Sequence, residues 1–430
     1  MSGFMLTENL LLGVSSAATS IEGGALQTSW AAWRRHGQFD GDDGTVGAGH
    51  RDHWGEDIFL MRRMGIQTYR FGLEWARIEP QEGIFDEDAF THYRAEIRSM
   101  KDAGIRPLLT FQRFTNPLWF ERLGGFERAE NLDFFLRFVR RSVEALGDLV
   151  SEYITFDSPN LYARCAYFDG FWSPGVRNAS RMYTVLTNLA SCHVRAYESI
   201  HKARRAMGFD DTKVSIAVHM HAYRPLVRGN PLHRALSAAA EFAAQGAFLQ
   251  AALLGRSIPP LKYDPFLRPG IYCDFHAVNY GGRTTVAAAQ REAERETYTD
   301  EMGQDIAPLC LIRCCRTLYD LAQLPIYVTE CGVCSSEDPL RAHFIYEHLR
   351  RICECELPIE RFYYRSFCDG AECLAGNSAR YGLVHIDFET MARSIKPSGD
   401  FYSEIIRARG VSEELYARFC AAPAAVQESF

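Results

Sequence analysis

The sequence has no long run of basic residues and no long run of apolar residues. The 430-residue chain carries a formal net charge of −7 at pH 7, which argues against a nucleic-acid-binding surface. No apolar stretch approaches the roughly 20 residues that a membrane helix needs. The first residues also lack the basic segment and apolar core of a secretory signal. We therefore expect a cytoplasmic protein that binds neither nucleic acid nor membranes.

The cysteines lack the spacing typical of zinc sites. The chain has 13 cysteines, an odd number, which favours reduced thiols in a cytosol over a disulfide framework. Cys353 and Cys355 have a single residue between them, whereas paired zinc ligands usually have two or more. We expect neither a metal nor a cofactor.

No stretch rich in Gly, Pro or Ser divides the chain, and no internal repeat is present. Eight short apolar runs alternate with amphipathic segments of helical periodicity, and several runs are apolar nearly throughout, as in strands buried on both faces. This alternation predicts an α/β protein, a single (β/α)8 TIM barrel over residues 1–430. The segment 225–269 exceeds the length of one helix, so we expect an extra helical insertion there, near the barrel mouth. The eight runs are 10–17, 68–73, 106–112, 153–157, 214–219, 274–280, 326–330 and 361–367.

In such barrels the functional residues lie at the carboxyl ends of the strands. The polar side chains at those ends are therefore the candidate site residues. His219 and His221 alternate near the end of the fifth run, so only one of them is expected to face the barrel centre. The other candidates are Ser20, Arg70, Arg113, Asp157, Ser158, Asn279, Tyr280, Glu330 and Arg365.

Several motifs in this order resemble glycoside hydrolase family 1, the β-glucosidase family. The segment 69–80 reads Tyr-Arg-Phe-Gly-Leu-Glu-Trp-Ala-Arg-Ile-Glu-Pro, and 326–330 reads Ile-Tyr-Val-Thr-Glu. The segments 12–23, 114–120 and 380–384 are similar to other parts of the family pattern. The resemblance covers nearly the whole chain and implies the (β/α)8 barrel.

The resemblance also implies a retaining double displacement, in which one carboxylate attacks the anomeric carbon and a second protonates the leaving oxygen. On this basis Glu330 is the nucleophile, and Arg70 is the cation that keeps it ionised. Asn279 matches the asparagine of the sixth-strand motif, and Glu372 matches the glutamate that binds sugar hydroxyls.

The chain departs from the family pattern at the same pocket. Where the family has Asn-Glu-Pro, this chain has Asp157, Ser158 and Pro159, so the resemblance implies that the acid/base carboxyl is lost. Serine cannot replace it, because a hydroxyl is far too weak an acid, and general acid catalysis contributes roughly 10² to 10⁴ in rate. The resemblance implies that further family residues of this pocket, which bind the sugar or adjoin the nucleophile, are replaced by Ser20, Arg113, Gly281, Cys331, Arg365 and Cys373.

Each of these residues has a structural and a functional interpretation. Glu330 and Arg70 are either a retained ion pair or a working group with its cation. Arg113 and Arg365 either form salt bridges that fill the old pocket or bind an anionic ligand. Asp157 is an alternative acid, although a shift of one residue turns its side chain another way.

Cys331 and Cys373 flank the two glutamates. They either form a reactive pair or a soft-metal site, or they fill the space of larger side chains.

Three functions follow. The first is a pseudoglycosidase with a repurposed or inactive sugar site. The second is an enzyme of altered chemistry that uses Glu330 on a small anionic ligand. The third is a β-glycosidase that acts by retaining double displacement on substrates with good leaving groups. The partner is a small molecule, either anionic or a glycoside, in all three cases.

Overall fold

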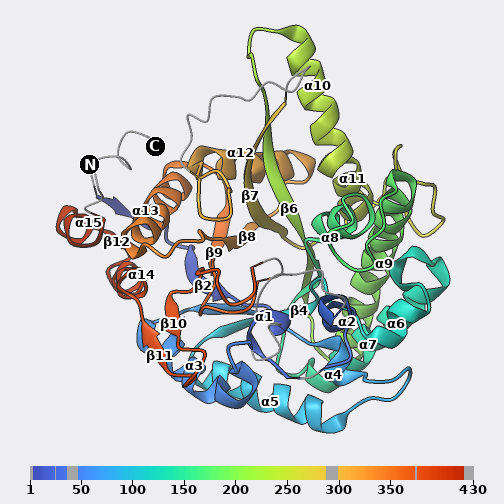
Figure 1. The fold of residues 1–430 in the computed structure, drawn as a ribbon, viewed down its shortest axis with the longest axis horizontal. Helices are drawn as coiled ribbons and strands as arrows, with labels where there is room; N and C mark the ends of the chain where they lie inside the picture. The colour runs from blue at the N-terminus through green and yellow to red at the C-terminus, as the bar shows by residue number, and fades with distance from the viewer. Residues whose placement is uncertain (1–2, 25, 36–46, 287–298, 373–374, 421–430) are drawn as a thin grey trace.

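A closed barrel of eight parallel strands forms the centre of the molecule (Figure 1). The computed structural model describes residues 3–24, 26–35, 47–286, 299–372 and 375–420. The last barrel strand pairs with the first, with Leu11 opposite Arg361 and Ser15 opposite Arg365. The predicted (β/α)8 barrel is therefore confirmed. In chain order the strands are β2 (Leu11–Ser15), β3 (Thr68–Gly72), β4 (Arg106–Gln112), β5 (Glu152–Asp157), β6 (Lys213–Pro225), β7 (His276–Val286), β8 (Ile326–Cys331) and β9 (Ile359–Arg365).

Amphipathic helices surround the barrel and bury their apolar faces against it. In α7 (Leu132–Leu146), Leu132, Phe135, Val139, Val143 and Leu146 form a buried stripe, and Gly147 caps the end of the helix. Burial of such a stripe is what stabilises a helix on a sheet. The larger surrounding helices are α3 (His50–Met64), α5 (Glu87–Asp102), α7 (Leu132–Leu146), α9 (Ala179–Ala206), α12 (Pro308–Leu321), α13 (Asp338–Glu354) and α14 (Pro397–Ala408).

Shorter elements complete the described part of the chain. Two antiparallel pairs lie outside the barrel, β1 (Phe4–Met5) with β12 (Gly410–Val411) and β10 (Val384–Ile386) with β11 (Arg393–Ile395). The remaining helices are α1 (Ala18–Ile21), α2 (Ser29–Arg35), α4 (Trp75–Ile78), α6 (Leu118–Arg122), α8 (Pro159–Tyr167) and α15 (Glu413–Phe419). None of the helices in the described ranges is long and apolar enough to span a bilayer.

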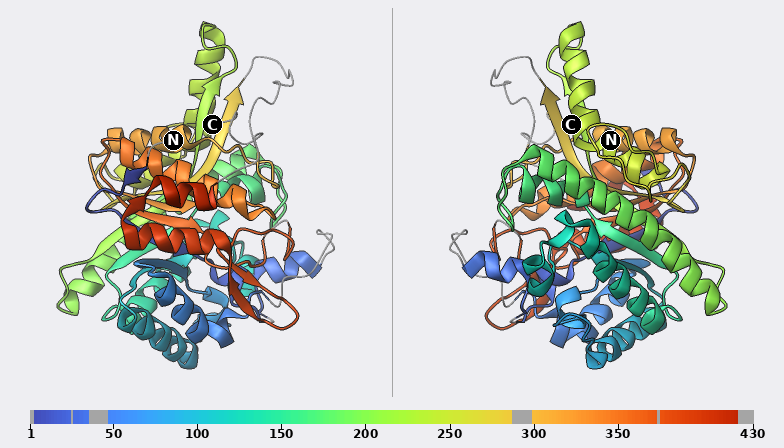
Figure 2. Two further views of the ribbon diagram at one scale, coloured as in Figure 1. Left: turned by 90° about the vertical axis from the view of Figure 1, so that its left-hand side faces the viewer. Right: turned by 90° about the vertical axis from the view of Figure 1, so that its right-hand side faces the viewer.

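Strands β6 and β7 continue well past the barrel as a projecting two-stranded ribbon (Figure 2). The two strands have 13 and 11 residues and end at Pro225 and Val286. The sequence predicted that they end near the barrel rim, at residues 219 and 280. The prediction was too short because the extensions mix polar with apolar residues and become half-buried towards their ends, from Arg224 in β6 and from Arg283 in β7, so they lack the continuous apolar run of the strands within the barrel. The segment 225–269 contains α10 (Pro231–Glu241), a π-helical turn (Phe242–Gly246) and α11 (Ala247–Leu254), and α10 projects beside the ribbon.

Candidate functional site

Two arginines hold Glu330 at the carboxyl end of β8. Arg70 Nη1 lies 3.4 Å and Arg113 Nη2 lies 3.3 Å from the same Glu330 oxygen. Burial alone would raise the pKa of Glu330, but Arg113, Arg70 and Arg365 outweigh it and lower that pKa to about 2. The carboxylate is therefore ionised at neutral pH, because adjacent cations favour its charged form.

The same two arginines also hold Asp157, which ends β5 and is completely buried. Arg70 forms an ion pair with one Asp157 oxygen, and Arg113 Nε lies 3.1 Å from that oxygen. The other oxygen accepts hydrogen bonds from Asn279 Nδ2 at 2.5 Å and from the Ser158 hydroxyl at 2.9 Å. Every one of these donors favours the charged carboxylate, so Asp157 is poorly placed to donate a proton.

Ser158 stands at the junction of β5 and α8, in the left-handed backbone region with φ 51°. Its hydroxyl donates to Asp157 and accepts from Asn279 Nδ2 at 2.8 Å. Asn279 is itself oriented by the Thr329 hydroxyl, which donates to its Oδ1 at 2.7 Å. The Ser158 side chain is therefore tied to its neighbours by two hydrogen bonds.

Arg365 projects into the same pocket from the end of β9. Its Nη2 lies 2.6 Å from Glu372 Oε2, and its guanidinium stacks 4.2 Å from the ring centroid of Tyr381. The three arginines thus meet three carboxylates, and each carboxylate contacts at least one of them. Ser20, Arg365 and Glu372 together line a small adjoining cavity of about 10 Å³.

The space left between these side chains is small. A cavity of about 150 Å³, here called the central cavity, is lined by eight of the predicted site residues. Pockets that bind drug-sized ligands usually enclose about 300 to 1,000 Å³. Arg70, Asp157 and Asn279 lie behind its wall. The eight are Arg113, Ser158, His219, Tyr280, Glu330, Cys331, Arg365 and Glu372.

Tyr280 and Cys331 line this cavity, but neither offers it a reactive group. The Tyr280 hydroxyl donates to the backbone carbonyl of Ala307 at 2.6 Å. Burial raises the pKa of the Cys331 thiol well above its usual value, so the thiolate that would attack or bind metal is disfavoured. Cys373 lies outside the described residues. Within the described ranges, no three His, Cys, Asp or Glu side chains come together as a metal site would require.

A histidine pair occupies the space beside Gly281. The Nε2 atoms of His219 and His221 are 2.9 Å apart, and a Cβ on Gly281 would lie 2.4 and 2.6 Å from them. Burial lowers the pKa of both rings, that of His221 to about 4. His219 alone of the two lines the central cavity. The expectation that only one of them faces the barrel centre misapplied strand alternation, because residues two apart on a strand share a face, and the two rings do meet.

Comparison with known proteins agrees with this architecture. The sequence pattern of Glycosyl hydrolase family 1 matches residues 4–259 and 276–411. β-Glucosidase A of Thermotoga maritima is 25% identical over 444 residues, which cover 94% of this chain and 98% of that protein. The chloroplastic galactolipid galactosyltransferase SFR2 of Arabidopsis thaliana is 24% identical over 386 residues, 84% of this chain and 58% of that protein.

Solved structures show the same fold. A β-glycosidase from Pyrococcus horikoshii superimposes with a TM-score of 0.87 and 28% identity, covering 99% of this chain and 100% of its own. The Thermotoga maritima β-glucosidase in complex with glucoimidazole has a TM-score of 0.86 at 24% identity, with 95% of this chain and 100% of its own covered. The barrel and the long sequence match together place this chain in glycosyl hydrolase family 1.

Proposed function

We propose that this protein is a pseudoglycosidase, a family 1 barrel whose sugar site no longer carries out double displacement on ordinary β-glycosides. The observation that carries the proposal is the position of Arg113, which contacts both Asp157 and Glu330. Retaining glycosidases need two carboxyl groups that face one glycosidic bond from a separation of about 5 to 5.5 Å. Here one of the two carboxylates is buried behind the cavity wall, and both are neutralised by shared arginines.

The acid step has no proton donor in this arrangement. The Ser158 hydroxyl, at the position where the family has its acid/base glutamate, is a far weaker acid than a carboxyl group. One Asp157 oxygen accepts from Arg70 and forms an ion pair with Arg113, and the other accepts from Asn279. Loss of general acid catalysis alone lowers a rate by roughly 10² to 10⁴.

The size and charge of the central cavity support the same proposal. About 150 Å³ remains, and the three arginines balance the three carboxylates. An incoming anion would have to separate an arginine from its carboxylate and leave that carboxylate buried without its cation, which costs several kcal/mol. A closed, charge-neutral pocket therefore fits the structure better than an anion site at this position.

A retaining β-glycosidase restricted to good leaving groups is the second candidate. Glu330 favours it, because this carboxylate is ionised, lines the central cavity and keeps 12% of its side chain exposed. An activated leaving group needs no proton, so Glu330 alone would suffice for the first step. One relative is named a galactosyltransferase, so transfer to an acceptor other than water belongs to this candidate.

We also propose that the protein is located in the cytoplasm, as the cysteine content of the sequence predicts. This location is supported by buried free thiols in the described ranges, among them Cys192, Cys314 and Cys331. A cytoplasmic location would keep them reduced.

The test is hydrolysis of 2,4-dinitrophenyl β-glucoside, with and without azide, by the native protein and by Glu330→Gln. β-Glucosidase A of Thermotoga maritima serves as the positive control. We expect no turnover of the activated glucoside above that of the Glu330→Gln variant. Azide-stimulated turnover that disappears in Glu330→Gln would replace the pseudoglycosidase with the second candidate. Glu330-dependent turnover of cellobiose would refute both.

A further inference from the structure

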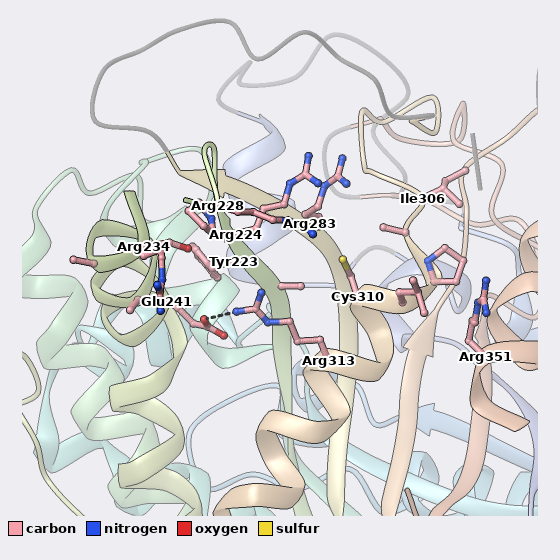
Figure 3. Close-up of a pocket in the computed structure, with 18 of the residues that line it drawn as sticks. Tyr223, Arg224, Arg228, Arg234, Glu241, Arg283, Ile306, Cys310, Arg313 and Arg351 are labelled. Atoms are coloured by element: carbon pink, nitrogen blue, oxygen red, sulfur yellow. Dashed lines mark hydrogen bonds and ion pairs between the residues drawn. The ribbon is translucent and has the colours of Figure 1, made fainter. Parts of the chain in front are cut away.

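A second and much larger cavity lies outside the barrel, between the projecting ribbon, α10 and the first turn of α12 (Figure 3). Its volume is about 1030 Å³, at the upper end of the range of small-molecule sites. We name it the ribbon pocket. Its basic lining residues are Arg224, Arg228, Arg234, Arg283, Arg313 and Arg351.

The charges of the ribbon pocket are unbalanced. Two glutamates, Glu241 and Glu347, accompany the six arginines in its lining. Glu241 lies 3.2 Å from Arg313, and Glu347 is turned to Arg350 at 2.8 Å, outside the lining. This excess of positive charge stands in a chain whose net charge is −7, so it does not follow from overall composition.

Three of the six arginines have no carboxylate partner within the described part of the chain. Arg283 pairs with Asp305 at 3.0 Å, and Arg351 pairs with Glu354 at 2.8 Å. Arg224, Arg228 and Arg234 form no ion pair with any described acidic residue. This pocket therefore differs from the central cavity, where every arginine contacts a carboxylate.

The ribbon brings two of these arginines together. Arg283 pairs in register with Ala222, and residues two apart on a strand share a face, so Arg224 emerges on the same side as Arg283. In Figure 3 both side chains emerge from the ribbon, and both line the pocket. Burial lowers the pKa of Arg224, and the nearby Arg283 and Arg228 lower it further. Like charges on one face of a ribbon repel each other, and a bound anion would relieve that repulsion.

One wall of the pocket is apolar. Residues 306–309, which lead into α12, read Ile-Ala-Pro-Leu and line it, as do two alanines of α10. A concave site that combines an apolar wall with a few converging polar groups is the usual form of a small-molecule site. Guanidinium groups bind phosphate and carboxylate oxygens in a bidentate manner.

From these observations we propose that the ribbon pocket binds a small organic polyanion, a phosphate ester or polycarboxylate, with its charged groups on Arg224, Arg228 and Arg283 and its organic part against residues 306–309. The site is separate from the sugar pocket of the barrel. It does not depend on whether Glu330 retains any activity.

The experiment is calorimetric titration of the full-length protein at low ionic strength with sodium tripolyphosphate and, separately, with citrate. We expect saturable binding of at least one of the two probes. Because each hydrogen bond to a charged group contributes about 1.5 to 3 kcal/mol, the loss of one arginine corresponds to about tenfold or more in Kd. The double variant Arg224→Gln/Arg228→Gln should therefore bind about 100-fold more weakly.

The matched control is Arg205→Gln/Arg316→Gln, which removes the same charge from exposed positions outside the pocket. Its Kd should stay within a few-fold of the native value, because exposed charges that are far apart are screened. Binding of tripolyphosphate alone would identify a phosphate site, and binding of citrate alone would identify a carboxylate site. The proposal is overturned if neither probe binds saturably, if the pocket variant binds as tightly as the native protein, or if the control loses as much affinity as the pocket variant.

Discussion

Replacing Asp157 with asparagine should destabilise the protein although the new side chain has the same shape. Asp157 is completely buried and contacts Arg70 and Arg113. Its removal leaves two guanidinium groups to share Glu330, and so leaves one positive charge uncompensated at the barrel centre. Breaking a buried ion pair from one side costs about 3 to 5 kcal/mol, and we expect Asp157→Asn to lower the free energy of unfolding by about that amount.

The companion variant Arg113→Gln reverses the imbalance. Asp157 and Glu330 would then share Arg70, and one negative charge would lack its cation. The double variant Asp157→Asn/Arg113→Gln is neutral again. It should therefore be more stable than the sum of the two single effects predicts, by about 1 to 3 kcal/mol, the usual coupling between contacting residues.

The measurement is a double-mutant cycle from urea unfolding curves. The control cycle uses Glu127→Gln and Arg181→Gln, a surface pair 2.6 Å apart whose side chains are 27% and 46% exposed. Exposed pairs couple by less than about 1 kcal/mol. Additivity of the Asp157 and Arg113 variants within about 0.5 kcal/mol would refute the reasoning that charge balance stabilises this pocket.

The remaining predictions concern pH and the histidine pair. The pKa of Glu330 is about 2 in the folded protein against an ordinary value of 4.5. Its contribution, on the order of 3 kcal/mol, is therefore complete above pH 4.5 and lost as pH falls towards 2. Urea unfolding from pH 6 to pH 2 should show a steeper loss for the native protein than for Glu330→Gln, and parallel curves would contradict this. His50 lies between Asp57 and Glu96 at 2.7 and 3.0 Å. Although burial opposes it, these carboxylates raise its pKa from 6.5 to about 10. The stability that His50 confers should be complete below pH 6.5 and lost as pH rises towards 10, so the deficit of His50→Gln should shrink over that interval in thermal unfolding. A Cβ at Gly281 would meet the two histidine rings, so Gly281→Ala should cost about 1 to 3 kcal/mol. It should also shift the imidazole NMR signals, and unchanged signals would mean that the rings do not fill this space.

The apolar runs were sufficient to predict the barrel, because strands buried on both faces have a continuous apolar signal. The same reasoning missed the ribbon. Residues such as Arg224 and Thr285 lie on half-exposed strands, where polar side chains are tolerated. The sequence of such a strand is therefore hard to distinguish from that of a loop.

The sequence predicted which residues belong to the candidate site, but it did not predict the contacts between them. Strand ends brought Arg70, Asp157 and Glu330 together, since parallel strands of one barrel end on one side. The direction of Arg365 depended on Glu372 and Tyr381, which follow β9 in the chain and whose placement the strand pattern does not determine. The arginines of the ribbon pocket come from two strands, three helices and one connection. In the sequence each of them is indistinguishable from an ordinary surface arginine, so the pocket could not be predicted.

The projecting ribbon also has a consequence for how molecules of this protein meet one another. Pairing of β5 with β6 ends at Ala217, and pairing of β8 with β7 ends at Asn279. Beyond these points, no described strand pairs with either outer edge of the ribbon. On β6 the side chains of Asn160 and Gln245 bind the backbone groups of His219 and His221, so a strand of another chain could pair only further out. Charged side chains on open edges oppose such pairing, so we expect Arg224 and Arg283 to hinder self-association. Variants that neutralise them should therefore self-associate more readily at high concentration, which light scattering would detect.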